Sequence, residues 1–164
     1  ISRIMSKVTD GMTLSQRLDR ARTYSARIQP QDISEVKALT NPSQEFIDIM
    51  TAATRVLGDS RSELTWKHVL REVKNPNRFI SRVHTLDPGR IGFNRANNIL
   101  EMDLSPLRQP EIQAKSMFLG VLLPCLSILC QIALFGGRNL EVASDKIVSL
   151  KKTIKIMEAL LDQQ

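Results

Sequence analysis

The longest apolar stretch of the chain covers residues 117–135 and contains no charged side chain. A stretch of roughly 18 or more apolar residues is long enough to cross a membrane, and it also suits the central helix of a helical domain. Pro124, Ser127 and Gln131 interrupt the stretch but exclude neither structure, because membrane helices tolerate all three residue types. The stretch alone therefore leaves both a membrane span and a buried helix open.

Narrow apolar seams mark both ends of the chain. Near the C-terminal end, apolar residues recur alternately three and four positions apart, at Leu140, Ala143, Ile147, Leu150, Ile154, Met157 and Leu161. This spacing is typical of a coiled coil. Near the N-terminal end, a first seam consists of Ile1, Ile4 and Val8. A second seam follows at Leu14, Leu18, Ala21, Ser25 and Ile28. The segment 10–13 shifts the phase between them, and Gly11 weakens the helix there.

The simplest interpretation is that the two end helices pair antiparallel as a stalk, although each seam could instead meet another chain. The chain then divides into an outgoing coiled-coil helix at 1–31, a helical domain at 32–138 and a returning coiled-coil helix at 139–164. In this arrangement both ends of the helical domain lie on the same side, whereas a single membrane span would place them on opposite sides. The pairing therefore favours a buried helix for residues 117–135.

The part between the seams predicts short helices separated by turns. One helix is predicted to begin with Asn41 as its N-cap and Pro42 in its first turn, and to end at Gly58. Others are predicted before Pro76, between residues 77 and 86, and around residues 93–104. A last helix is predicted to start at Glu111 and to continue to the end of the apolar stretch. No alternating β pattern of useful length occurs, so we predict an all-α fold: a small helical bundle at the tip of an antiparallel two-helix coiled-coil stalk.

Basic residues outnumber acidic ones, and the net charge of the chain is +6. Between residues 66 and 90 only Glu72 and Asp87 oppose a run of basic side chains, which are Lys67, Arg71, Lys74, Arg78, Arg82 and Arg90. Arg95, Arg108 and Lys115 follow this run. Such a bias favours an acidic partner, such as nucleic acid, an anionic membrane or an acidic protein surface. An ordinary solvated surface would also explain it.

The sequence contains no motif that indicates catalysis, neither a G-x-x-x-x-G-K-[ST] phosphate loop nor a G-x-S-x-G nucleophile turn. His68 and His84 lack the spacing of metal ligands, so we expect each to be a surface residue and expect no metal site. Cys125 and Cys130 would point about 140° apart on a helix, so they cannot pair. We expect them to be core side chains in a reducing compartment. Enzymatic activity and a cofactor are therefore not expected of this chain.

Four phrases of the chain, in their order along the sequence, carry a resemblance to one protein family. They are "DISEVKALTNP", "FIDIMTAATRVLG", "LTWKHVLREVKNPNRFISRVHTLDPGRI" and "SPLRQPEI". In this order they resemble the stalk tip of the dynein heavy chain, from the junction of the outgoing stalk helix to the last helix of the microtubule-binding domain. The chain departs from the family pattern at Ser43, where the family has a second proline, and at Thr65, where it has aspartate. The resemblance spans nearly the whole chain.

The resemblance implies that the chain binds microtubules of α/β-tubulin, with the ATPase of the motor lying outside this chain. It also implies that shifts in the register of the stalk coiled coil set the affinity for the microtubule. Carried over position by position, the resemblance points to Lys37, Arg95 and Lys115 as microtubule-binding residues, and less directly to Arg90 and Arg108. Their role would be to complement the acidic surface of tubulin, which favours fast and correctly oriented association.

The partners that the resemblance implies are tubulin and the rest of the dynein heavy chain, reached through the stalk, and neither nucleic acid nor a membrane. Because neither end of the sequence resembles a natural terminus, we expect a segment of a longer protein. The implied location is the cytoskeleton, either in the cytoplasm or in the axoneme of a cilium or flagellum. A helical nucleic-acid-binding module and a membrane-anchored coiled-coil module remain the alternative interpretations.

Overall fold

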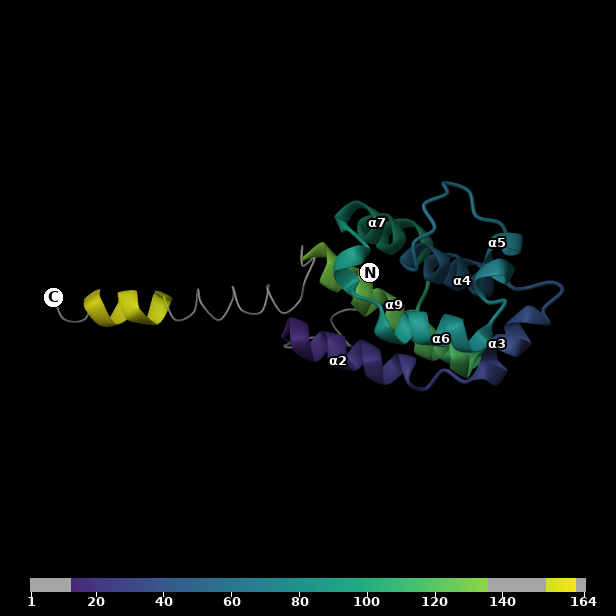
Figure 1. The fold of residues 1–164 in the computed structure, drawn as a ribbon, viewed down its shortest axis with the longest axis horizontal. Helices are drawn as coiled ribbons and strands as arrows, with labels where there is room; N and C mark the ends of the chain where they lie inside the picture. The colour runs from purple at the N-terminus through teal and green to yellow at the C-terminus, as the bar shows by residue number, and fades with distance from the viewer. Residues whose placement is uncertain (1–12, 136–152, 162–164) are drawn as a thin grey trace.

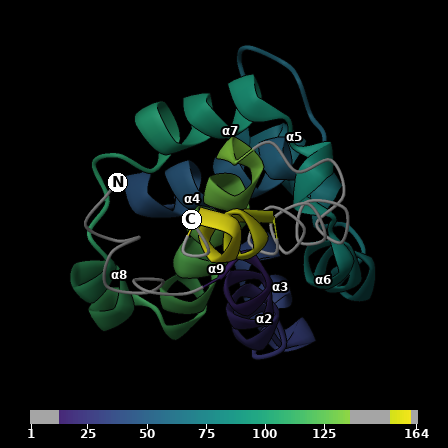
Figure 2. The ribbon, with the colours of Figure 1, turned by 90° about the vertical axis from the view of Figure 1, so that its left-hand side faces the viewer.

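The apolar stretch forms the helix at the centre of the fold. The computed structural model describes residues 13–135 and 153–161. Helix α9 (Met117–Leu134) is surrounded by other helices (Figures 1 and 2), and fourteen of its residues are buried. Within the described ranges it is the one helix long and apolar enough to cross a membrane, and 78% of that apolar window is buried inside the protein. This packing agrees with the interpretation of the stretch as a buried helix.

The described residues form helices and connecting turns but no strand, which confirms the predicted all-α class. Residues 13–135 form a bundle. In chain order its elements are α2 (Leu14–Ser25), α3 (Pro30–Lys37), α4 (Gln44–Val56), α5 (Trp66–Glu72), α6 (Pro76–Thr85), η1 (Pro88–Arg90), α7 (Phe93–Asn98), η2 (Ile99–Asp103), α8 (Gln109–Lys115) and α9. The element η1 is a 3₁₀ turn and η2 is a π-helical turn. Residues 153–161 form a further helical segment.

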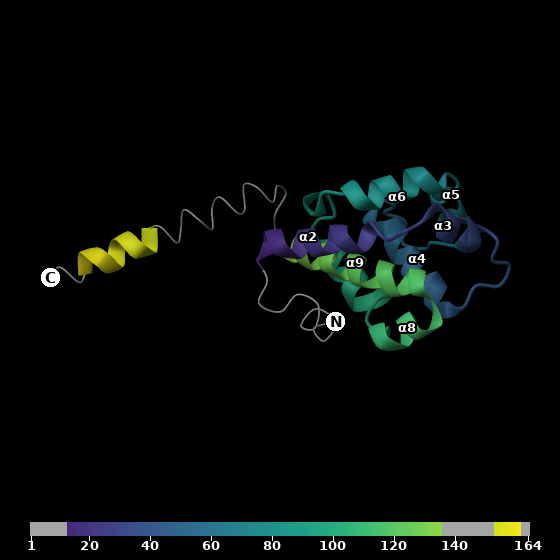
Figure 3. The ribbon, with the colours of Figure 1, turned by 90° about the horizontal axis from the view of Figure 1, so that it is seen from below.

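Helices α2 and α9 lie side by side and run in opposite directions (Figures 1 and 3). The guanidinium of Arg17, near the start of α2, lies over the ring of Phe135, just after the end of α9, with 5.4 Å between its carbon and the ring centre. The N-terminal seam faces the core, where Ala21, Ser25 and Ile28 are buried. The first helix of the bundle therefore begins where the last one ends.

Polar contacts also join the C-terminal half of α2 to the end of α6. The guanidinium of Arg22 donates hydrogen bonds to the carbonyl oxygens of Leu86, at 2.6 Å, and Val83, at 3.5 Å. Ser25 Oγ and His84 Nδ1 are hydrogen-bonded at 2.7 Å. A cation at the C-terminal end of a helix is favourable, because it pairs with carbonyl groups that have no partner within the helix. These contacts explain why α2 is held to the bundle.

The predicted stalk falls largely outside the described residues. Ile1, Ile4 and Val8 lie outside them, as do Leu140, Ala143, Ile147 and Leu150 of the C-terminal seam. The rest of that seam lies in the segment 153–161, where the exposed fractions of Ile154, Met157 and Leu161 are 54%, 57% and 67%. The described part of the N-terminal seam packs within the bundle, so the coiled-coil pairing stays a prediction.

Two predicted helix boundaries are wrong, and both corrections concern a serine N-cap. Helix α4 begins after Ser43 rather than after Asn41, because Ser43 Oγ accepts a hydrogen bond from the backbone N–H of Phe46 at 3.4 Å. The single helix predicted from Glu111 onward is two helices, α8 and α9. Ser116 separates them in an extended conformation, with φ −156° and ψ 122°, and its Oγ accepts from the N–H of Leu119.

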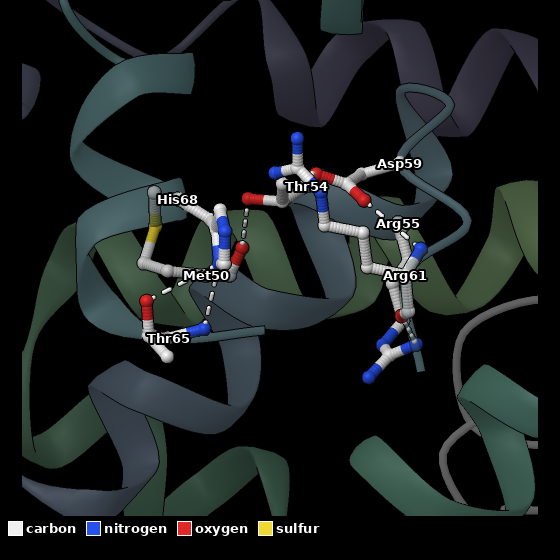
Figure 4. A network of polar contacts seen from close by, with 7 residues as sticks. All are labelled: Met50, Thr54, Arg55, Asp59, Arg61, Thr65 and His68. Atoms are coloured by element: carbon white, nitrogen blue, oxygen red, sulfur yellow. Dashed lines mark hydrogen bonds and ion pairs between the residues drawn. The ribbon is translucent and has the colours of Figure 1, made fainter. Parts of the chain in front are cut away.

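Side chains tie the loop between α4 and α5 to the end of α4 (Figure 4). Arg55 donates hydrogen bonds to the carbonyl oxygens of Arg61 and Ser62, at 2.9 and 3.1 Å. Asp59 pairs with Arg61 within the loop at 3.3 Å. Gly58 has a φ of +120°, which suits the glycine predicted to end α4. The loop is thereby tied to the last turn of α4.

Candidate functional site

Helices α8 and α9 meet at a tight corner that carries Lys115. A Cβ atom on Gly120 would lie 2.9 Å from the Cα of Gln113, so glycine is what allows the two helices to approach so closely. At the corner, Lys115 Nζ donates a hydrogen bond to Glu45 Oε1, near the start of α4, at 2.6 Å. The exposed fraction of the side chain is 62% for Lys115 and 29% for Glu45. The lysine is thus positioned at the surface with one acidic neighbour.

The ion pair shifts the pKa of both partners. The hydrogen bond from Lys115 lowers the pKa of the Glu45 carboxyl below its ordinary value of 4.5, and the same contact raises the pKa of Lys115 above 10.5. Because the pKa of Glu45 is lowered in the folded protein, its contribution to stability is present above pH 4.5 and is lost as the pH falls through the lowered value. At neutral pH both groups are charged.

A titration of Glu45 tests this pair. In the wild-type chain we expect the carboxyl carbon of Glu45, followed by NMR, to titrate with a midpoint below 4.5. In Lys115→Gln the midpoint should rise toward 4.5, because the charged donor is gone. Lys67→Gln, on α5, is a control that should leave the midpoint unchanged. An identical midpoint in the wild type and in Lys115→Gln would show that the two side chains do not interact in solution.

Lys115 and Lys37 lie far from the point where α2 begins. Helix α9 has 18 residues and is therefore roughly 27 Å long, with the Lys115 corner at its start and Phe135 at its end. Helix α3 follows the end of α2 and lies at the same end of the bundle (Figure 3). There Lys37 Nζ donates a hydrogen bond to the carbonyl of Lys74, just after α5, at 3.0 Å. We call this end of the bundle, where α3 ends and α9 starts, the distal end.

The three arginines among the predicted residues are spread over the bundle. Arg90 is exposed in η1, Arg95 is half-buried in α7, and Arg108 is exposed at the N-cap of α8. Helices α7 and α8 lie on different sides of α9 (Figure 2). Within residues 13–135 and 153–161, no hydrogen bond or ion pair joins any two of the five predicted residues. Their binding role stays a prediction.

The basic run is less uniform than its sequence indicates. Arg82 forms an ion pair with Glu72 and donates to the carbonyl of Leu57 at 2.8 Å, so it ties α6 to α5 and to the end of α4. Outside the run, Arg55 pairs with Asp103 at 3.3 Å, and burial nevertheless raises the pKa of that carboxyl. Both arginines therefore have partners within the bundle.

The histidines and cysteines have structural roles. The two histidines, expected at the surface, are half-buried on α5 and α6 and hydrogen-bonded: His84 contacts Ser25, and His68 Nδ1 accepts the backbone N–H of Thr65 at 3.0 Å. Cys125 and Cys130 are buried and unpaired, as expected, and burial raises the pKa of Cys125 to about 12. In the part of the chain that the structure describes, no cluster of three or more metal-ligating side chains occurs.

Sequence reasoning missed the pairing of Glu45 with Lys115, because the two residues are far apart in the chain and no local pattern connects them. It also missed that Lys37 is hydrogen-bonded within the bundle. Comparison of the chain with models of known protein families gives no match, and comparison with curated proteins gives none either.

Proposed function

We propose that this chain is the microtubule-binding head of a dynein-type heavy chain. The observation that carries the proposal is the antiparallel packing of α2 and α9, with Arg17 against Phe135. A head on a two-helix stalk needs its first helix to begin where its last helix ends. The stalk would then attach at this end, and the distal end, with Lys37 and Lys115, would meet tubulin.

The order of the four sequence phrases supports the same proposal. The junction phrase "DISEVKALTNP" covers α3 from Asp32 onward and the turn after it, and "SPLRQPEI" covers the start of α8. In the resembled family these are the entrance to the microtubule-binding domain and the approach to its last helix. By the same resemblance, the register of the stalk coiled coil would set the affinity for the microtubule.

In this proposal the chain performs no chemistry of its own. The parent motor would hydrolyse ATP elsewhere in the heavy chain, and this segment would bind and release the microtubule in the cytoplasm or in an axoneme. Basic side chains would complement the acidic tubulin surface and chiefly increase the rate and accuracy of docking. We place Lys37 and Lys115 at the centre of the interface, with Arg90, Arg95 and Arg108 contributing from its surroundings.

Cosedimentation with microtubules tests the proposed function. We expect the chain to sediment with microtubules at low salt, to remain bound in the presence of excess DNA, and to dissociate as salt is added. The salt effect follows from screening, because the Debye length falls from about 10 Å at 0.1 M to about 3 Å at 1 M. Release by DNA at constant salt would instead support the nucleic-acid-binding alternative and refute the proposal.

A further inference from the structure

The ring of Tyr24, a half-buried residue of α2, contacts two arginines. The guanidinium carbons of Arg20 and Arg27 lie 5.2 and 5.8 Å from the ring centre of Tyr24. Arg20 lies one helical turn before Tyr24 in α2, and Arg27 lies in the turn just after the C-cap Ala26, so one arginine approaches the ring from each direction along the chain. The neighbouring Ala21, Ser25 and Ile28 are buried. We call Arg20, Tyr24 and Arg27 the arginine clamp.

The two arginines of the clamp have no acidic partner. Among residues 13–135 and 153–161, neither Arg20 nor Arg27 forms an ion pair, although both are exposed. When a guanidinium stacks on an aromatic ring, its N–H groups remain free to donate two parallel hydrogen bonds to a carboxylate. It also restrains two long side chains before any partner arrives, which lowers the entropic cost of binding. The clamp is therefore a pair of oriented, unused hydrogen-bond donors.

We propose that the arginine clamp is a binding site for an acidic peptide segment of a partner protein. In an extended peptide, carboxylates two residues apart point to the same side about 7 Å from each other. Two guanidiniums on one ring can span such a pair. This site lies outside the five residues proposed to contact tubulin, and the inference does not depend on the proposed function.

Other anionic partners fit the clamp less well. A membrane surface normally takes up apolar side chains beside the basic ones, and the large exposed hydrophobic residues that the structure describes lie on other elements, none of them on α2. Binding of single-stranded nucleic acid depends on aromatic rings that are free to stack bases. The ring of Tyr24 is already in contact with two guanidiniums, which leaves less of it for a base. An acidic peptide needs neither feature.

Fluorescence anisotropy with a short labelled oligoglutamate peptide tests the clamp in the full chain. We expect Arg20→Gln combined with Arg27→Gln to raise Kd about tenfold. The matched control is Arg71→Gln combined with Arg78→Gln, which removes the same charge from exposed positions on α5 and α6. The control should retain the wild-type Kd. An equal loss in both double variants would mean general electrostatic attraction and would overturn the site.

Substitutions of Tyr24 test whether its ring contributes to peptide binding. Tyr24→Leu keeps the charge but removes the stacking surface, so we expect it to weaken peptide binding severalfold, whereas Tyr24→Phe should bind like the wild type. Circular dichroism and urea unfolding check that each variant is folded. Wild-type affinity in folded Tyr24→Leu would refute the clamp as a built site. Tighter, clamp-dependent binding of single-stranded DNA or phosphatidylserine vesicles than of the peptide would overturn the assignment of the partner.

Discussion

Replacing Leu126 with alanine is expected to lower the free energy of unfolding by about 3 kcal/mol. Leu126 lies in the middle of α9 and is fully buried. Its truncation removes apolar contacts and leaves a cavity that the surrounding helices can only partly fill. Since small domains are stable by about 5–15 kcal/mol, the loss should be a large fraction of the total. Urea unfolding followed by circular dichroism measures it.

Leu160→Ala is the matched control for Leu126→Ala. The same side chain is removed, but Leu160 lies in the segment 153–161 and is 58% exposed. We expect a change within about 0.5 kcal/mol. If the two variants unfold alike in aqueous solution, α9 is not the core of the fold, and the membrane-span interpretation of the apolar stretch gains support.

Reversing the charge of Lys115 is expected to weaken microtubule binding about tenfold. Lys115→Glu places a negative charge at the distal end, against an acidic tubulin surface, and leaves Glu45 without its partner. Arg95→Glu should act in the same direction. Microtubule cosedimentation over a range of tubulin concentrations gives the affinity, and circular dichroism checks the fold of each variant.

Lys155→Glu is the control for the charge reversals. Lys155→Glu changes the net charge of the chain by the same amount as Lys115→Glu. Lys155 is exposed, but it lies in the segment 153–161 and outside the bundle. We expect it to bind microtubules like the wild type. An equal loss of affinity in Lys155→Glu and Lys115→Glu would mean that only net charge matters and that the distal end has no special role.

Local sequence signals were enough for the presence and type of the helices. The apolar stretch has the length of a helix, and the predicted pairing of the two end seams favours a buried helix over a membrane span. Gly58 ended α4 as expected, because its positive φ is costly for other residues. These features depend on neighbours in the chain, so the sequence displays them directly.

Helix starts were harder to predict, because several residues near a helix start can serve as the N-cap. Both Asn41 and Ser43 have suitable side chains for α4, and the structure uses Ser43. Ser116 interrupts what the sequence presents as one helix, because the short helix α8 turns back to pack against α9 at Gly120. This packing is a tertiary contact, and it outweighs the local tendency of the sequence to continue as one helix.

The candidate site was the least predictable part. The narrow apolar seam of α2 does not specify which helix it packs against. The folded bundle shows that the described part of this seam packs against α9. The run of basic residues likewise gave no sign that Arg82 is paired inside while Arg90 is exposed. Whether a basic side chain is available to another molecule depends on its ion-pair partners within the bundle, and these partners can lie far away in the sequence.

The orientation of the bundle on a microtubule tests whether the distal end is the surface that binds tubulin. Electron cryo-microscopy of microtubules decorated with this chain would show the direction of α9, the long central helix. If the distal end binds tubulin, the Met117 end of α9 lies against tubulin and its Leu134 end points away from the lattice. A bundle bound with the Leu134 end against tubulin, or microtubules that carry no bound chain at low salt, would contradict it.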